Sequence, residues 1–252
     1  MSAPPRRIAY GPGPEQYAEL TLPSGGSPSR GTVVIIHGGY WRAPYTAELG
    51  RPLARDLADR GFACWNLEYR RAGNGGGWPV TFSDIRAGID ALADAAGSFD
   101  IDLSTITLLG HSAGGHLAVL AAAQAGSRVA VSGVVSQSGV LNLAEAHELG
   151  LSDGAVQNFL GCSPEEDPQR YREADPMFAL PLHVPAWVLH GEDDTTVPFT
   201  QSAGWAEAAA AAGGRVHLRR IPGDHFAMIT PGTPAWDAVV RAVGEAAGIT
   251  GT

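Results

Sequence analysis

One serine of the chain stands in a pattern that could make it a nucleophile. The sequence GHSAG at residues 110–114 follows the apolar run Ile106–Leu109 and leads into a segment with helical spacing, marked by Leu117 and Leu120. A serine on such a sharp strand-to-helix turn exposes its hydroxyl for attack on a carbonyl carbon. The flanking glycines suit the strained backbone of the turn and the close approach of helix and strand. We therefore predict that Ser112 is a catalytic nucleophile rather than part of an ordinary turn.

A serine nucleophile needs a base, and the chain offers eight histidines for this role. His225 follows the last apolar run, Val216–Ile221, and precedes the last helical segment, so we expect it at the same sheet edge as Ser112. His37 and His190 each end a strand directly before a glycine, and we expect them to brace loops through hydrogen bonds. His225 is the predicted base.

A carboxylate must orient the base and stabilise its charged form. Three carboxylates follow the apolar run Ala186–Leu189, namely Glu192, Asp193 and Asp194. Their position fits the chain order of serine, acid and histidine that hydrolases with a GxSxG turn use. The chemistry of the residues does not choose among the three, and the two that are not used are expected to lie in a solvated acidic turn.

A glycine pair could stabilise the negative charge that develops on the attacked carbonyl oxygen. The sequence HGGYW at residues 37–41 ends the apolar run Thr32–Ile36, and consecutive glycines let backbone N–H groups turn toward such an oxyanion. We predict the N–H groups of Gly39, Tyr40 and Ala113 as the donors. The alternative is a glycine turn with a purely structural role.

Aromatic residues on the same loops are candidates for binding a substrate. Besides Tyr40, they are Trp41 after the glycine pair, Trp78 at the end of a glycine-rich loop, and Phe226 next to the predicted base. The alternative for each is core or rim packing, which is favoured most for Trp41. A pocket formed by even two of these residues would be narrow and would suit short or flat groups.

The elements that must position these residues can be predicted from hydrophobic periodicity. Six apolar runs predict buried strands: Thr32–Ile36, Phe62–Leu67, Ile106–Leu109, Val129–Val135, Ala186–Leu189 and Val216–Ile221. Stretches with helical spacing lie between them, which predicts an α/β fold with a mostly parallel central sheet and helices on both faces. Such sheets bind ligands beyond the carboxyl ends of their strands. Residues before about Gly31 predict one or two leading antiparallel strands and a turn at Pro23–Pro28.

Length and composition predict one domain. A chain of 252 residues with 44% hydrophobic content can bury one large core, so residues 1–252 are expected to form a single domain. The stretch from Leu141 to Leu182 has no clear strand and is expected to form a small cap inserted over the sheet.

The formal charge of −9 gives no basic surface for nucleic acid. The sequence shows no secretion signal and no membrane-spanning run, and its two isolated cysteines suit a cytoplasmic protein. We find no motif for a metal or a nucleotide cofactor, so none is predicted. The composition leaves open whether the chain forms a homo-oligomer.

Taken together, these motifs resemble the α/β-hydrolase superfamily over most of the chain, from about Thr32 to Val243. The loop at residues 37–41 is similar to the HGGxW loop of kynurenine formamidases and to the HGGG loop of hormone-sensitive-lipase-like esterases, from which it departs at Tyr40. In those families the second glycine and the next residue supply the oxyanion donors. The resemblance also implies the acid, because the family pattern HGxxDxxVP places its aspartate on Asp194.

The resemblance implies a serine esterase that cleaves small or medium carboxylic esters through an acyl-enzyme. An arylformamidase that hydrolyses N-formylkynurenine is the alternative within enzymes, so the expected partner is a small-molecule ester or amide. A hydrolase fold that only binds its ligand is the alternative outside enzymes, but it would be expected to lack one of the three catalytic residues.

Overall fold

The computed structural model describes residues 4–24, 29–99, 101–124 and 126–249. One twisted sheet runs through the molecule in the strand order β1-β2-β4-β3-β5-β6-β7-β8. Its strands are β1 (Arg6–Ala9), β2 (Tyr17–Thr21), β3 (Thr32–Ile36), β4 (Ala63–Leu67), β5 (Ile106–His111), β6 (Val131–Gln137), β7 (Ala186–Gly191) and β8 (Val216–Ile221). Strands β3 to β8 are parallel, whereas β1 and β2 pair antiparallel at one edge. The predicted fold class is therefore confirmed, as are the leading antiparallel strands.

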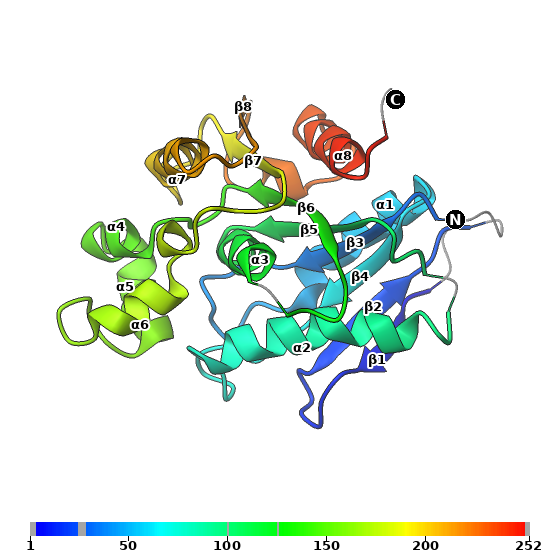
Figure 1. Cartoon of the computed structure of the whole chain (residues 1–252), viewed down its shortest axis with the longest axis horizontal. Coiled ribbons are helices and arrows are strands. Elements are labelled where there is room, and N and C mark those ends of the chain that lie inside the picture. The colour runs from blue at the N-terminus through cyan, green and yellow to red at the C-terminus, as the bar shows by residue number, and fades with distance from the viewer. Residues whose placement is uncertain (1–3, 25–28, 100, 125, 250–252) are drawn as a thin grey trace.

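Helices cover both faces of this sheet (Figure 1). On one face lie α1 (Arg51–Asp59) and α8 (Pro234–Ala246), and on the other lie α2 (Val80–Ala95), α3 (Ala113–Ala123) and α7 (Thr200–Ala211). At α8 the Thr233 hydroxyl accepts a hydrogen bond from the Trp236 N–H and Pro234 is the first helical residue, which are residue types preferred at these two positions. No helix in the described ranges has the length and apolar character needed to cross a membrane.

Three strands extend beyond the apolar runs that predicted them. β5 continues to His111, β6 to Gln137 and β7 to Gly191. These extensions are polar or glycine residues at the carboxyl end of the sheet, so a hydrophobic pattern does not detect them. The predicted turn at Pro23–Pro28 lies partly outside the described residues.

The segment between β6 and β7 consists of short helices and contributes no strand within its described residues. It contains α4 (Leu143–Glu148), α5 (Leu151–Leu160), α6 (Pro168–Ala174) and the 3₁₀ turn η2 (Pro176–Phe178). These elements group together at one side of the molecule, next to α3 and α7 (Figure 1). We refer to residues 143–174 as the α4–α6 segment.

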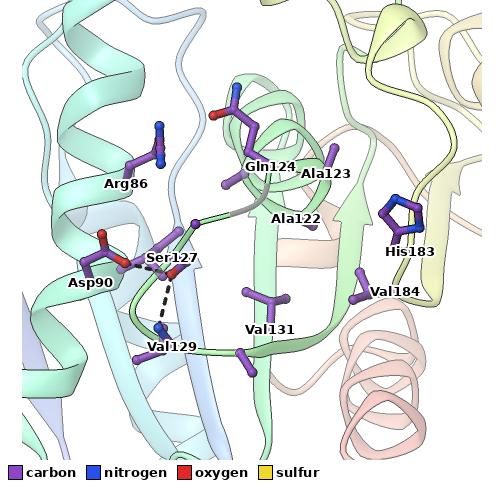
Figure 2. Close-up of a pocket in the computed structure, with 14 residues that line it drawn as sticks. Arg86, Asp90, Ala122, Ala123, Gln124, Ser127, Val129, Val131, His183 and Val184 are labelled. Carbon is purple, nitrogen blue, oxygen red and sulfur yellow. Dashed lines mark hydrogen bonds between the residues drawn. The ribbon is translucent and has the colours of Figure 1, made fainter.

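A cavity of about 320 Å³ lies between α2, the end of α3 and the loop that leads to β6. Arg86 and Asp90 border it on one side and His183 on the other, and Ser127 donates a hydrogen bond to Asp90 (Figure 2). Ser112 precedes the first residue of α3, whereas this cavity contacts the last residues of the same helix. The cavity therefore lies away from the predicted nucleophile.

Candidate active site

Ser112 occupies the sharp turn between β5 and α3. Its φ of 55° and ψ of −121° are strained for a residue with a side chain. The turn requires Gly114, because a Cβ there would lie 2.0 Å from the carbonyl oxygen of Ile36 on the neighbouring strand. The same backbone crowding that demands a glycine holds the serine at the carboxyl end of the sheet, as the sequence predicts.

His225 and Asp194 meet beside this turn. His225 Nδ1 lies 2.7 Å from Asp194 Oδ2. An ionised carboxylate only accepts hydrogen bonds, so the proton sits on Nδ1, and Nε2 is left as an acceptor for a nucleophile's proton. Glu192 and Asp193 are exposed to solvent, whereas only 1% of the Asp194 side chain is exposed. Of the three predicted candidates, the structure brings Asp194 to the histidine.

The environment of Asp194 keeps its carboxyl group ionised. Burial alone would raise its pKa, but hydrogen bonds from His225, from the Val197 N–H and from the Ser138 hydroxyl, together with the positive charge that His225 can carry, lower it to about 2. Oδ1 accepts hydrogen bonds from the Thr196 and Val197 N–H groups, at 2.9 and 2.8 Å. The carboxylate is thus fixed in both charge and orientation.

Ser138 is a part of this acid site that the sequence analysis missed. It directly follows β6 and has a left-handed φ of 47°. Its hydroxyl oxygen also accepts a hydrogen bond from the Gly191 N–H at 3.3 Å. Ser138 therefore links the end of β7, which leads to Asp194, to the end of β6. Its place directly after a strand is the only signal that the sequence contains.

His111 is buried next to His225, but it is poorly suited to act as a base. Its Nε2 lies 2.9 Å from the His225 carbonyl oxygen, so the ring donates a hydrogen bond to the backbone of His225. Burial, with a further contribution from His225, lowers the pKa of His111 to about 3. The neutral ring therefore supports the backbone of the neighbouring histidine.

The loop after β3 packs directly on the nucleophile turn. A Cβ on Gly38 would lie 3.0 Å from the Ser112 Cβ. Residues 39–42 then form a tight turn, closed by a hydrogen bond of 3.0 Å from the Arg42 N–H to the Gly39 carbonyl. No backbone hydrogen bond among the described residues uses the N–H groups of Gly39, Tyr40 or Ala113. The three predicted oxyanion donors therefore have no backbone partner in the described chain.

Buried side chains stabilise the loop after β3 through hydrogen bonds and ion pairs. His37 Nδ1 donates to the Gly38 carbonyl at 2.8 Å, and its Nε2 lies 3.2 Å from Glu68 Oε1. Arg71, which is also buried, pairs with the same carboxylate. His190 stabilises the loop that carries Asp194 in a similar way, through hydrogen bonds with the Ser202 hydroxyl at 2.7 Å and the Val197 carbonyl at 2.9 Å.

Trp41, which the sequence predicts as a substrate-binding residue, packs in the hydrophobic core. Its side chain is fully buried and stacks on Phe159 of α5, with ring centroids 4.6 Å apart. The indole N–H donates to His116 Nδ1 at 3.2 Å. The backbone turn after Gly39 points this ring into the core, which is the alternative that the sequence analysis favours for Trp41.

This burial predicts a large effect on stability. Trp41→Ala is expected to lower the free energy of unfolding by about 3–5 kcal/mol, because it leaves a cavity against Phe159 and removes the hydrogen bond to Nδ1 of the buried His116. Urea unfolding followed by circular dichroism measures the change. Trp78→Ala is the matched control with a smaller expected loss, since Trp78 is only partly buried. Equal losses for the two variants would contradict this assignment of Trp41 to the core.

Phe226 and Trp78 differ in their placement. Phe226 is 56% exposed and meets the His225 ring edge-on, at a centroid distance of 5.2 Å. The Trp78 ring stacks on Phe82 of α2, and the backbone N–H of Trp78 donates to the Phe159 carbonyl at 2.9 Å. The structure therefore brings Phe226 to the predicted base, while the contacts of Trp78 tie its loop to α2 and α5.

Besides Phe226, Tyr45 is an exposed aromatic residue near the predicted site. The sequence analysis did not select Tyr45. It is 47% exposed and packs so closely over Gly39 that a Cβ there would lie 2.3 Å from the tyrosine Cβ. Since it follows no strand directly, the sequence contains no clear signal for it.

The strand order and the strained serine turn after β5, with the glycine loop after β3 beside it, define the α/β-hydrolase fold. The strand order reverses between β3 and β5, where ligands of such sheets bind. Residues 18–208 match the BD-FAE family model, and the chain belongs to this family.

Two curated relatives and one solved structure that resemble this chain are esterases by name. Esterase LipQ of Mycobacterium tuberculosis is 28% identical over 96% of the chain and 61% of its own length. Isoprenylcysteine alpha-carbonyl methylesterase ICME of Arabidopsis thaliana is 29% identical over 84% of the chain and 54% of its own length. The structure of esterase B from Lactobacillus rhamnosis superposes with a TM-score of 0.83 at 22% identity, covering 96% of this chain and 85% of that one. The chain thus spans little more than half the length of these two curated relatives.

Proposed function

We propose that this chain is a serine hydrolase of carboxylic esters, with Ser112 as nucleophile, His225 as base and Asp194 as the residue that orients the base. The hydrogen bond between His225 and Asp194 next to the strained serine turn is the observation that carries this proposal. The esterase names of its relatives support it. We also propose that the chain forms a single catalytic domain, with residues 141–182 as a small cap.

In this mechanism His225 Nε2 takes the Ser112 proton while Oγ attacks the ester carbonyl carbon. The N–H groups of Gly39, Tyr40 and Ala113 then bind the carbonyl oxygen as it becomes negative. The alcohol leaves with the proton from His225, and an acyl group stays on Ser112. A water molecule, deprotonated by His225, releases the acid and regenerates the serine.

The exposed aromatic side chains suggest which esters fit. Phe226 beside the base and Tyr45 over Gly39 supply flat apolar surfaces next to the proposed reacting atoms. We expect nitrophenyl acetate and butyrate to be hydrolysed faster than nitrophenyl esters of ten or more carbons, by about 10- to 200-fold for each poorly accommodated step in size. Values of kcat/KM across the series measure this preference, and faster cleavage of long-chain esters would contradict the narrow pocket.

The HGGxW sequence at residues 37–41 supports one alternative, the hydrolysis of N-formylkynurenine. A formyl-specific pocket has room only for hydrogen on the acyl carbon. N-formylkynurenine would then exceed every ester in kcat/KM on the same enzyme preparation. Higher values for the short esters would support the esterase proposal.

A further inference from the structure

Two left-handed turns are in contact, one in the loop after β3 and the other in the α4–α6 segment. The first is the turn at residues 39–42, in which Tyr40 and Trp41 have φ values of 48° and 55°. The second lies inside the α4–α6 segment, where Ser152, Asp153 and Gly154 have φ values of 49°, 52° and 69°. Left-handed backbone is strained in residues other than glycine, and it persists where surrounding contacts hold it.

Arg42 joins the two turns. Its backbone closes the first turn, and its guanidinium group donates to the second. Nη1 donates to the Ser152 hydroxyl at 3.2 Å, while Nη2 donates to the Ser152 carbonyl and, at 3.4 Å, to the Asp153 carbonyl. A planar guanidinium can bind several acceptors in fixed directions at once, which a lysine ammonium on a flexible stem does less well. The contact therefore sets the position of one turn relative to the other.

The neighbouring side chains hold the first turn from other directions. The Tyr40 hydroxyl donates to the Thr196 carbonyl at 2.8 Å, within the loop that carries Asp194. Trp41 is fixed between His116 and Phe159. Tyr40 thus anchors this strained turn to the loop that carries Asp194, whereas Trp41 and Arg42 anchor it to different residues of α5. In the described chain, the hydrogen bonds from this turn to residues 152–153 all come from Arg42.

We propose that Arg42 is a positioning residue that sets the oxyanion donors according to the placement of the α4–α6 segment. The Tyr40 N–H lies within the turn that Arg42 closes, so a rotation of this turn would move the N–H away from the oxyanion. The inference rests on the proposed ester hydrolysis. It assigns to Arg42 no contact with the substrate.

The test is Arg42→Gln, assayed with nitrophenyl acetate. We expect kcat to fall about tenfold with little change in KM, because oxyanion contacts act mainly in the transition state. A trifluoromethyl ketone, which forms an oxyanion adduct with the serine, should lose affinity by the same factor as kcat/KM. The kcat of Arg42→Lys should lie between the values of the wild-type protein and of Arg42→Gln. Unchanged kcat, or a loss confined to KM, would overturn the proposal.

Arg170→Gln is the matched control. Arg170 donates to the Leu160 carbonyl at 2.9 Å within the same α4–α6 segment, so it resembles Arg42 in type and in acceptor. It has no contact with the turn at residues 39–42 among its hydrogen bonds and ion pairs in the described chain. We expect its kcat to stay near the wild-type value, and an equal loss in both variants would show a general effect of the segment and overturn the proposal.

A triple variant separates positioning from simple stabilisation. Ser152→Gly and Asp153→Gly relieve the strain of the second turn, and they are added to Arg42→Gln. If Arg42 only stabilised that turn, the glycines would restore kcat, and this rescue would overturn the proposal. Persistent loss supports it. A wild-type protein that hydrolyses no ester would instead overturn the proposed function, and the role of Arg42 with it.

Discussion

Replacing Ser112 with alanine is expected to lower ester turnover by about 10⁴- to 10⁶-fold, because the acyl-enzyme can no longer form. The remaining activity would come from oxyanion donors and substrate binding. Turnover of nitrophenyl acetate measures the loss, and circular dichroism checks that the variant folds. Ser163→Ala is the control, since Ser163 lies in the loop between α5 and α6 and should keep full activity.

Covalent labelling tests the same assignment without a choice of substrate. A fluorophosphonate should add one adduct to the wild-type protein at Ser112 and none to the alanine variant, as read by mass spectrometry of the peptides. A wild-type protein that does not react, or an adduct on another serine, would refute the nucleophile assignment.

Asp194→Asn is expected to lower turnover by about 10⁴-fold, the loss typical for removal of an orienting carboxylate. The Thr196 and Val197 N–H groups donate to Oδ1, so an asparagine would keep its oxygen there and turn its NH₂ group toward His225. That donor would force His225 to accept at Nδ1 and to carry its proton on Nε2, where a base needs an empty acceptor. The loss is measured by comparing kcat of Asp194→Asn with that of the wild-type protein between pH 6 and 9.

The neighbouring carboxylates supply the controls for this variant. Glu192→Gln and Asp193→Asn should stay within about tenfold of wild type, because both side chains are exposed and neither contacts His225 in the described structure. If Asp193→Asn were the inactive variant, the assignment of the acid would be wrong. With a pKa of about 2, Asp194 stays ionised at every pH of such an assay.

The sequence alone was sufficient for the fold class and for the position of the nucleophile turn, because both depend on local signals. Apolar runs in the parallel strands reflect burial on both faces, and the spacing of Leu117 and Leu120 reflects the helix that follows Ser112. Glycine at residue 114 reflects the close backbone contact at the turn. These constraints act within a few residues or on a whole strand, so they are visible in the order of residue types.

Long-range packing decided the rest. Trp41 belongs to the core because two left-handed residues turn its ring toward Phe159, and no local pattern reveals that direction. Only the approach of the loops after β7 and β8 brings Asp194 rather than its two acidic neighbours to His225, whereas the sequence needed a family resemblance to choose it. The link from Arg42 to Ser152 joins residues 110 positions apart. Such contacts depend on how finished elements pack against one another, which residue types along the chain do not specify by themselves.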